Sequence, residues 1–132
     1  MPEFSSVMEY QKQSINTMSK GELLIRLYDE LLKNIRCASL LFKDKNSDAA
    51  KKCTGKVRRI IHYLNEILDR SYSLSGDLEK IYDFLNTEVF RAELRGDHEA
   101  LDKIVPLVQE LRDTWVQANK LSHMESSQKG AV

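Results

Sequence analysis

The sequence predicts an all-α protein, an antiparallel up-down four-helix bundle with an N-terminal capping segment. Apolar residues recur at alternating spacings of three and four along four separate stretches, the pattern of one apolar stripe per amphipathic helix. Short polar breaks separate the stretches, and short connections favour antiparallel neighbours in a bundle. Only five Gly and two Pro occur in 132 residues, so long stretches are free to be helical.

The first helix is expected to begin at Ser19. Residues 19–22 fit a capping box, in which the Ser19 hydroxyl accepts from the N3 amide and Glu22 reaches back to the Ser19 amide. Met18 can pack onto Leu23 across this cap. One stripe then runs down the helix: Leu24, Tyr28, Leu31, Ile35, Ala38 and Phe42.

The second helix follows the polar break at residues 43–46, with Asn46 or Ser47 as its cap. We expect it to end around Ser71. Its stripe consists of Cys53, Val57, Ile60, Leu64 and Ile67.

The third helix is expected to begin at Ser75 or Asp77. Gly96 is well placed as the residue that ends it, and Asp97 can cap the helix that follows. The stripe of the third helix is Leu78, Ile81, Leu85, Val89 and Ala92.

The fourth helix contains Pro106. Because proline has no amide hydrogen, the backbone hydrogen bond to the Asp102 carbonyl is lost, and we expect a kink at this position. Its stripe is Leu101, Ile104, Val108, Leu111, Trp115 and Ala118. The predicted organisation is therefore an N-terminal cap or lid over residues 1–18, the bundle over 19–123, and a disordered tail over 124–132.

The composition excludes several classes of function. Hydrophobic residues make up 42% and charged residues 30%, which is typical of a folded globular domain. Lys+Arg and Asp+Glu both total 20, so no nucleic acid partner is expected. No apolar run approaches the roughly 18 residues of a membrane span, so no membrane insertion is expected. No secretory signal is visible, and Cys37 and Cys53 are interpreted as two reduced core thiols of a cytoplasmic protein.

The sequence contains no pattern typical of catalysis. A di-metal bundle requires inward Glu-x-x-His pairs, but Arg59, Arg95 and Lys120 stand three positions before the three histidines. The cysteines have no sequence partner that marks a nucleophile, and there is no glycine-rich phosphate loop. We therefore expect no catalytic residue, no metal, no cofactor and no small-molecule substrate.

Two groups of residues have more than one interpretation. A basic run could face an acidic partner or form a solvated helix face: Lys51, Lys52, Lys56, Arg58 and Arg59. A set of aromatic residues could cover helix boundaries or line a groove that binds a partner helix by its apolar face: Tyr72, Tyr82, Phe84, Phe90 and Trp115.

The order and spacing of several short motifs resemble the flagellin-specific export chaperones, the FliS family. The first motif is Tyr10, Ile15, Thr17-Met18-Ser19-Lys20, Glu22-Leu23 and Leu27-Tyr28-Asp29. Three further segments agree: Ile60-Ile61 with Leu64 and Leu68, residues 81–85 and residues 111–115. The similarity covers residues 10–121. The chain departs from the family pattern at Lys20, Glu30 and Glu93.

The resemblance implies a cytoplasmic chaperone that binds the disordered C-terminal region of flagellin, prevents premature polymerisation and delivers it to the flagellar type III export apparatus. It also implies recognition of the loaded complex by a component of the export gate. The candidate partner-binding residues are a lid of Tyr10, Ile15 and Met18, then Leu23, Leu27 and Tyr28 beneath or beside it, and Tyr82, Phe84, Val89 and Trp115 as further groove residues. Each of them could instead belong to the core.

Two other classes of function stay open at this point. One is a different helical adaptor, such as a chaperone for a hook-associated protein or a regulatory bundle that docks on a partner helix. The other is an enzyme with a metal site inside the bundle.

Overall fold

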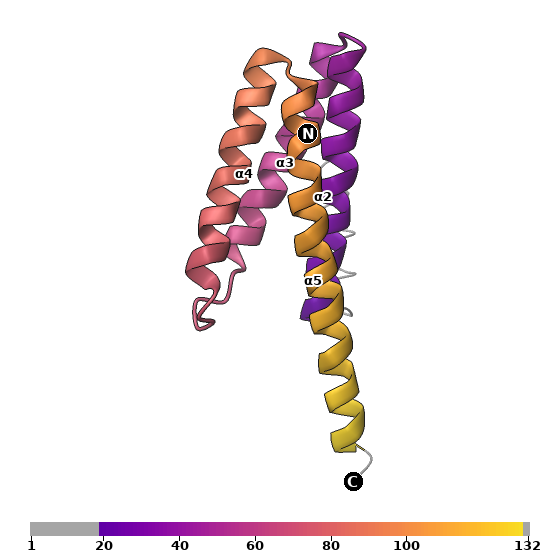
Figure 1. The fold of residues 1–132 in the computed structure, drawn as a ribbon, viewed down its shortest axis with the longest axis vertical. Coiled ribbons are helices and arrows are strands. Elements are labelled where there is room, and N and C mark those ends of the chain that lie inside the picture. Colours follow the sequence, from indigo (N-terminus) through magenta and orange to yellow (C-terminus); the bar gives the residue numbers. More distant parts are fainter. Residues whose placement is uncertain (1–18, 131–132) are drawn as a thin grey trace, which may run out of the picture.

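The computed structural model describes residues 19–130, except for the side chains of residue 123 and residues 125–130. It contains four helices, α2 (Lys20–Lys43), α3 (Ser47–Glu66), α4 (Ser75–Arg95) and α5 (His98–Gly130). Successive helices run antiparallel (Figure 1), so the predicted all-α four-helix bundle is confirmed. The predicted capping segment, residues 1–18, lies outside the described residues.

Local hydrogen bonds fix where the helices begin and end. The Ser19 hydroxyl accepts from the Glu22 amide at 3.2 Å, as the capping box predicts. Gly96 ends α4 in the left-handed conformation with a φ of 63°, which glycine adopts without a steric penalty. Asp97 then accepts from the Ala100 amide at 3.1 Å and caps α5. These three predicted boundaries are confirmed.

The structure differs from the sequence prediction at two other boundaries. α3 ends at Glu66 and not around Ser71. Asp69 accepts from the Ser71 amide at 2.9 Å and from its hydroxyl at 2.6 Å, a local turn that competes with helix. The sequence also predicts disorder over residues 124–132, whereas α5 continues to Gly130. No Pro or Gly interrupts residues 124–129, so the backbone is free to continue as helix.

The core is formed by one face of each helix. Its largest fully buried side chains include Leu31 and Ile35 from α2, Leu64 from α3, Leu85 from α4 and Leu101 from α5. All five belong to the predicted apolar stripes. The predicted stripe therefore lies on or beside the packed face of each helix, but in α4 Tyr82 is buried whereas the predicted Leu78 and Ile81 are only partly buried.

The helices do not pack equally. α2 packs extensively against α3 and α5, whereas α4 contacts α3 and touches α5 less. Figure 1 shows α4 leaning away from α5 toward its N-terminal end, and the C-terminal part of α5 extending beyond the other helices. α5 runs through Pro106 as one helix. At the start of α2, a Cβ on Gly21 would lie 2.2 Å from Asn119 Oδ1, so glycine permits the close approach of α5.

The two cysteines correct another expectation. Cys37 is exposed on α2 and Cys53 is half-buried on α3, so they are not two core thiols. Their Sγ atoms lie 3.5 Å apart. Cys37 immediately precedes the buried Ala38 and therefore sits at the edge of the packed face of α2.

None of the described helices has both the length and the apolar character that crossing a membrane requires.

Candidate partner-binding surface

Two buried tyrosines connect helices on opposite corners of the bundle. The hydroxyl of Tyr28 on α2 lies 2.6 Å from the hydroxyl of Tyr82 on α4, and the two side chains are 0% and 2% exposed. Trp115 on α5 is partly buried and packs against the same core. The hydroxyl pair of Tyr28 and Tyr82 therefore joins α2 to α4 across the interior of the bundle.

This environment keeps both phenols neutral. Burial is the largest cause that raises the pKa of Tyr28, and the hydrogen bonds from Tyr82 and Trp115 oppose it. Burial also raises the pKa of Tyr82, and the neighbouring Tyr28 raises it further. An ionised phenolate here would lose its hydration without gaining a cation. The tyrosine pair is therefore a structural feature of the interior.

The structure separates the ten candidate residues into three groups. Tyr10, Ile15 and Met18 lie outside the described residues. The second group is buried or partly buried in the bundle: Leu23, Leu27, Tyr28, Tyr82, Val89 and Trp115. Phe84 alone among the described candidates is exposed, at 50%. Most of the candidates therefore follow the alternative core interpretation, and Phe84 remains a candidate for surface contact.

α4 also exposes apolar side chains outside its packed face, and the sequence pattern did not predict them as one group. Phe84 is 50% exposed, Phe90 44% and Leu94 70%, and we call these three residues the α4 outer surface. At about 100° per residue, Leu94 lies opposite the buried Leu85, whereas Phe84 and Phe90 lie on the two flanks of that side, about 120° apart. The three apolar side chains are therefore exposed away from the packed face, with polar side chains between them.

The turn before α4 continues this apolar character. Tyr72 and Leu74 are 65% and 64% exposed, and they directly precede the first residue of α4. Five of the eight large apolar side chains that are exposed in the described part of the chain thus lie on α4 or in its leading turn. These side chains are spread along the length of α4 and its leading turn, and they are candidates for contact with a partner.

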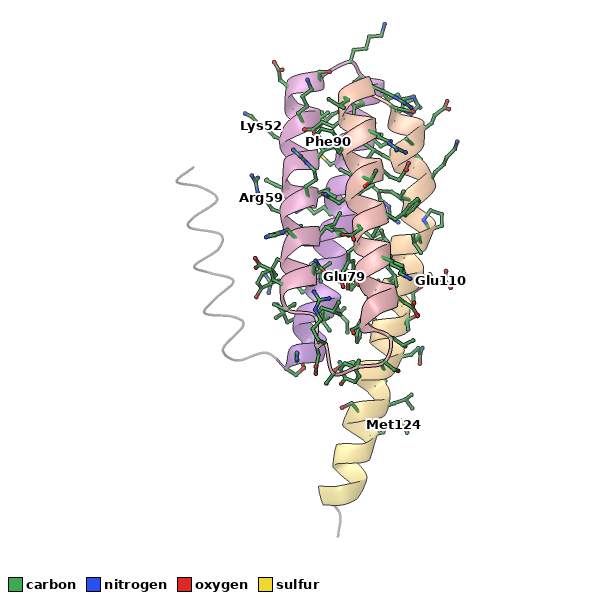
Figure 2. The ribbon with its side chains drawn as sticks, turned by 90° about the vertical axis from the view of Figure 1, so that its left-hand side faces the viewer. Lys52, Arg59, Glu79, Phe90, Glu110 and Met124 are labelled. Atoms are coloured by element: carbon green, nitrogen blue, oxygen red, sulfur yellow. The ribbon has the colours of Figure 1, made fainter. Side chains whose placement is uncertain are left out.

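Charged side chains border the α4 outer surface on the side of α3. Arg58 on α3 lies 5.5 Å from the centre of the Phe90 ring and pairs with Glu93 at 3.3 Å. Figure 2 shows Phe90 on this side, with Lys52 and Arg59 pointing outward from α3. The basic run thus divides: Arg58 takes part in the contact between α3 and α4, while Lys51, Lys52, Lys56 and Arg59 form an exposed helix face.

The described residues offer little for small-molecule chemistry. Within residues 19–130, no group of three or more His, Cys, Asp or Glu could hold a metal ion. His62 is exposed and pairs with Glu66 at 3.0 Å. A cavity of about 80 Å³ between α3 and α4 is smaller than the usual ligand pocket. A larger depression of about 470 Å³ is lined by α5 alone.

These observations define a class of protein: a four-helix bundle with a mainly aliphatic core, a buried tyrosine pair and exposed apolar side chains along one helix and the turn before it. The comparisons with known proteins agree with this class. The sequence model of the family described as "Flagellar protein FliS" matches residues 4–122. The chain belongs to the FliS family of flagellar secretion chaperones.

Two characterised relatives support the assignment. The chain is 29% identical to the flagellar secretion chaperone FliS of Bacillus subtilis (strain 168) over 123 residues, 93% of this chain and 92% of the relative. It is 25% identical to the flagellar secretion chaperone FliS of Escherichia coli (strain K12) over 107 residues, 79% of each chain. The resemblance inferred from the short motifs is therefore confirmed.

The buried tyrosine pair predicts a loss of stability at alkaline pH. Both pKa values are raised above the usual tyrosine value of about 10. Above that pH the unfolded tyrosines ionise while the folded ones stay protonated, so unfolding releases protons. The free energy of unfolding should then fall by up to about 1.4 kcal/mol per pH unit for each tyrosine. Urea unfolding at intervals from pH 8 to about 11 measures this slope.

The matched control for this prediction is the double variant Tyr28→Phe/Tyr82→Phe, which removes both phenols and keeps both rings. Its free energy of unfolding should decline less steeply above pH 10 than that of the unaltered chain. Equal slopes in the two proteins would contradict the assignment of the alkaline transition to this pair.

Proposed function

We propose that the chain is a cytoplasmic export chaperone that binds the disordered C-terminal region of flagellin. It prevents premature polymerisation and delivers flagellin to the flagellar type III export apparatus. Membership of the FliS family supports the general role. The observation that carries the proposal is the α4 outer surface, the exposed apolar side chains of Phe84, Phe90 and Leu94 on one helix.

The proposed mechanism is docking of a helix on a helical surface. A disordered segment with apolar residues at helical spacing folds as it binds, and its apolar face covers the α4 outer surface. The same face of the client is then unable to associate with other flagellin molecules. No nucleotide or other cofactor takes part in this step.

The energetics indicate how far the client must extend. Completing the burial of the half-exposed Phe84, Phe90 and Leu94 contributes about 1 kcal/mol each, about 3 kcal/mol together. Ordering a disordered segment costs about 2–5 kcal/mol. The α4 outer surface alone therefore only offsets the ordering cost. The client must also cover further apolar residues, and Tyr72 and Leu74 in the leading turn are the nearest exposed ones along the chain.

Residues 1–18, with Tyr10, Ile15 and Met18, act in this proposal as a lid that competes with the client for the same surface. The segment joins α2 at its N-cap, Ser19. Eighteen residues reach up to about 60 Å when extended. The 21 residues of α4 are about 32 Å long, so the length of the segment is sufficient to cover α4.

Two further parts of the proposal rest on the family. The loaded complex is recognised by a component of the export gate, after client binding has changed the exposed surface of the bundle. A second candidate function is an adaptor or chaperone for another flagellar protein, such as a hook-associated protein. The same apolar surface would serve that client, so the identity of the peptide that binds most tightly distinguishes the two.

Substitutions on the α4 outer surface should weaken flagellin binding. Phe84→Ser, Phe90→Ser and Leu94→Ser should each raise Kd about fivefold, because each removes about 1 kcal/mol of apolar burial. Leu40→Ser is the matched control, since Leu40 is 64% exposed but lies on α2. Calorimetry with a peptide of the flagellin C-terminal region measures Kd, and thermal unfolding checks that each variant folds.

Unchanged affinity in all three α4 variants, with full stability, would contradict docking on this surface. A peptide from a hook-associated protein is the competitor. Tighter binding of that peptide than of the flagellin peptide would favour the second candidate function.

Deleting residues 1–16 should strengthen flagellin binding, because the client no longer displaces the lid. The deletion leaves Ser19 and its cap intact. The measurement is the same calorimetric titration with the shortened chain, compared with the full chain at equal temperature and salt. An unchanged Kd would argue against a competing lid.

A further inference from the structure

The two cysteines form a pair that the proposed chaperone function does not use. Cys37 Sγ on α2 and Cys53 Sγ on α3 lie 3.5 Å apart, although 16 positions separate them in the sequence. α2 and α3 are antiparallel neighbours that pack extensively along each other. The two sulfur atoms are therefore held together by the packing of the hairpin and need no large movement to react.

The two thiols differ in their environments. Cys37 is exposed to solvent, whereas Cys53 is half-buried. Partial burial and the neighbouring Cys37 raise the pKa of Cys53 to about 11, and the charge of Lys56 opposes this shift. A thiolate is the reacting form of cysteine, and access also controls its rate. The first reaction with a dissolved reagent therefore falls on Cys37, and Cys53 is placed to react second.

We propose that Cys37 and Cys53 form a reversible dithiol modification site, which a low-molecular-weight disulfide converts to an intramolecular bond between α2 and α3. The supporting observations are the adjacent sulfur atoms, the access to Cys37 and the fixed helix pair that carries them. This inference is independent of which client the chain binds.

The reaction balances as two thiol–disulfide exchanges. The Cys37 thiolate attacks one sulfur of the dissolved disulfide, forms a mixed disulfide and releases one small thiolate, which takes up the proton lost by Cys37. The Cys53 thiolate then attacks Cys37 Sγ, forms the bond between Cys37 and Cys53, and releases the second small thiolate, which takes up the proton from Cys53. The protein loses two electrons and two protons, and the dissolved disulfide becomes two thiols.

The bond would close a loop that contains the end of α2, the turn and the start of α3. Cross-linking two positions reduces the conformational freedom of the unfolded chain, so the oxidised protein should be more resistant to unfolding. An excess of small thiol runs both exchanges in reverse and removes this added resistance.

The test uses the native full chain and oxidised glutathione as the probe, followed by intact mass spectrometry under non-reducing conditions. The expected product has lost the mass of two hydrogens, carries no glutathione, and maps to a peptide joining Cys37 to Cys53. Its melting temperature should rise by several degrees and return to the starting value after reduction. The Cys37→Ser/Cys53→Ser variant should show neither change.

Single variants test the order of the two exchanges. Cys53→Ser should accumulate a stable glutathione adduct on Cys37, because the second thiol is missing. Cys37→Ser should form its adduct more slowly. The proposal is overturned if the native chain collects glutathione on both cysteines without closing the bond, if only cross-linked dimers form, or if the intramolecular bond appears only in denaturant.

Discussion

The hydrogen bond between the Tyr28 and Tyr82 hydroxyls requires one rotation of α4, the same rotation that buries Leu85, Val89 and Ala92. Polar atoms buried away from water must be paired, so the two oxygens have to meet inside the bundle. α2 and α4 occupy opposite corners, and this bond spans the interior between them. Because Tyr82 must point inward, helical geometry directs Phe84 and Leu94 outward on the other side of α4. The same rotation of α4 therefore allows the hydrogen bond between the two tyrosines and exposes the apolar side chains on the outside of the helix.

The unequal packing of the helices leaves α4 less covered by its neighbours than α2. α2 is held by α3 on one side and α5 on the other, whereas α4 has its larger contact with α3 and a smaller one with α5. Arg58, which contacts Phe90 and pairs with Glu93, helps to hold α4 against α3. A stable core therefore supports a helix that keeps much of its apolar surface available. Such a surface suits a chaperone that must hold a client and later release it, because the gain in burial is close to the cost of ordering the client.

The sequence predicted the architecture because the spacing of Leu31, Leu85 and Val108 follows the helical period, and because Ser19 and Gly96 carry their own capping chemistry. The sequence did not predict that Tyr82 points into the core. The apolar spacing placed Ile81 in the stripe, whereas the structure buries the next residue, Tyr82, which lies 100° further around the helix. The pairing of two hydroxyls from distant helices has no sequence pattern at all.

The sequence predicted only part of the α4 outer surface. Phe84 and Phe90 were predicted as possible groove residues because they are aromatic, whereas nothing in the sequence distinguishes Leu94 from other leucines. The adjacency of Cys37 and Cys53 likewise depends on the register of α2 against α3, which periodicity does not fix.

We propose that the apolar side chains exposed by this rotation of α4 are where flagellin binds. The most direct measurement is a crystal structure of the chain bound to a peptide of the flagellin C-terminal region. The account predicts a peptide helix lying over Phe84, Phe90 and Leu94, with these side chains buried and the bond between Tyr28 and Tyr82 intact. A peptide bound elsewhere on the bundle, with Phe84, Phe90 and Leu94 as exposed as in the free protein, would contradict it.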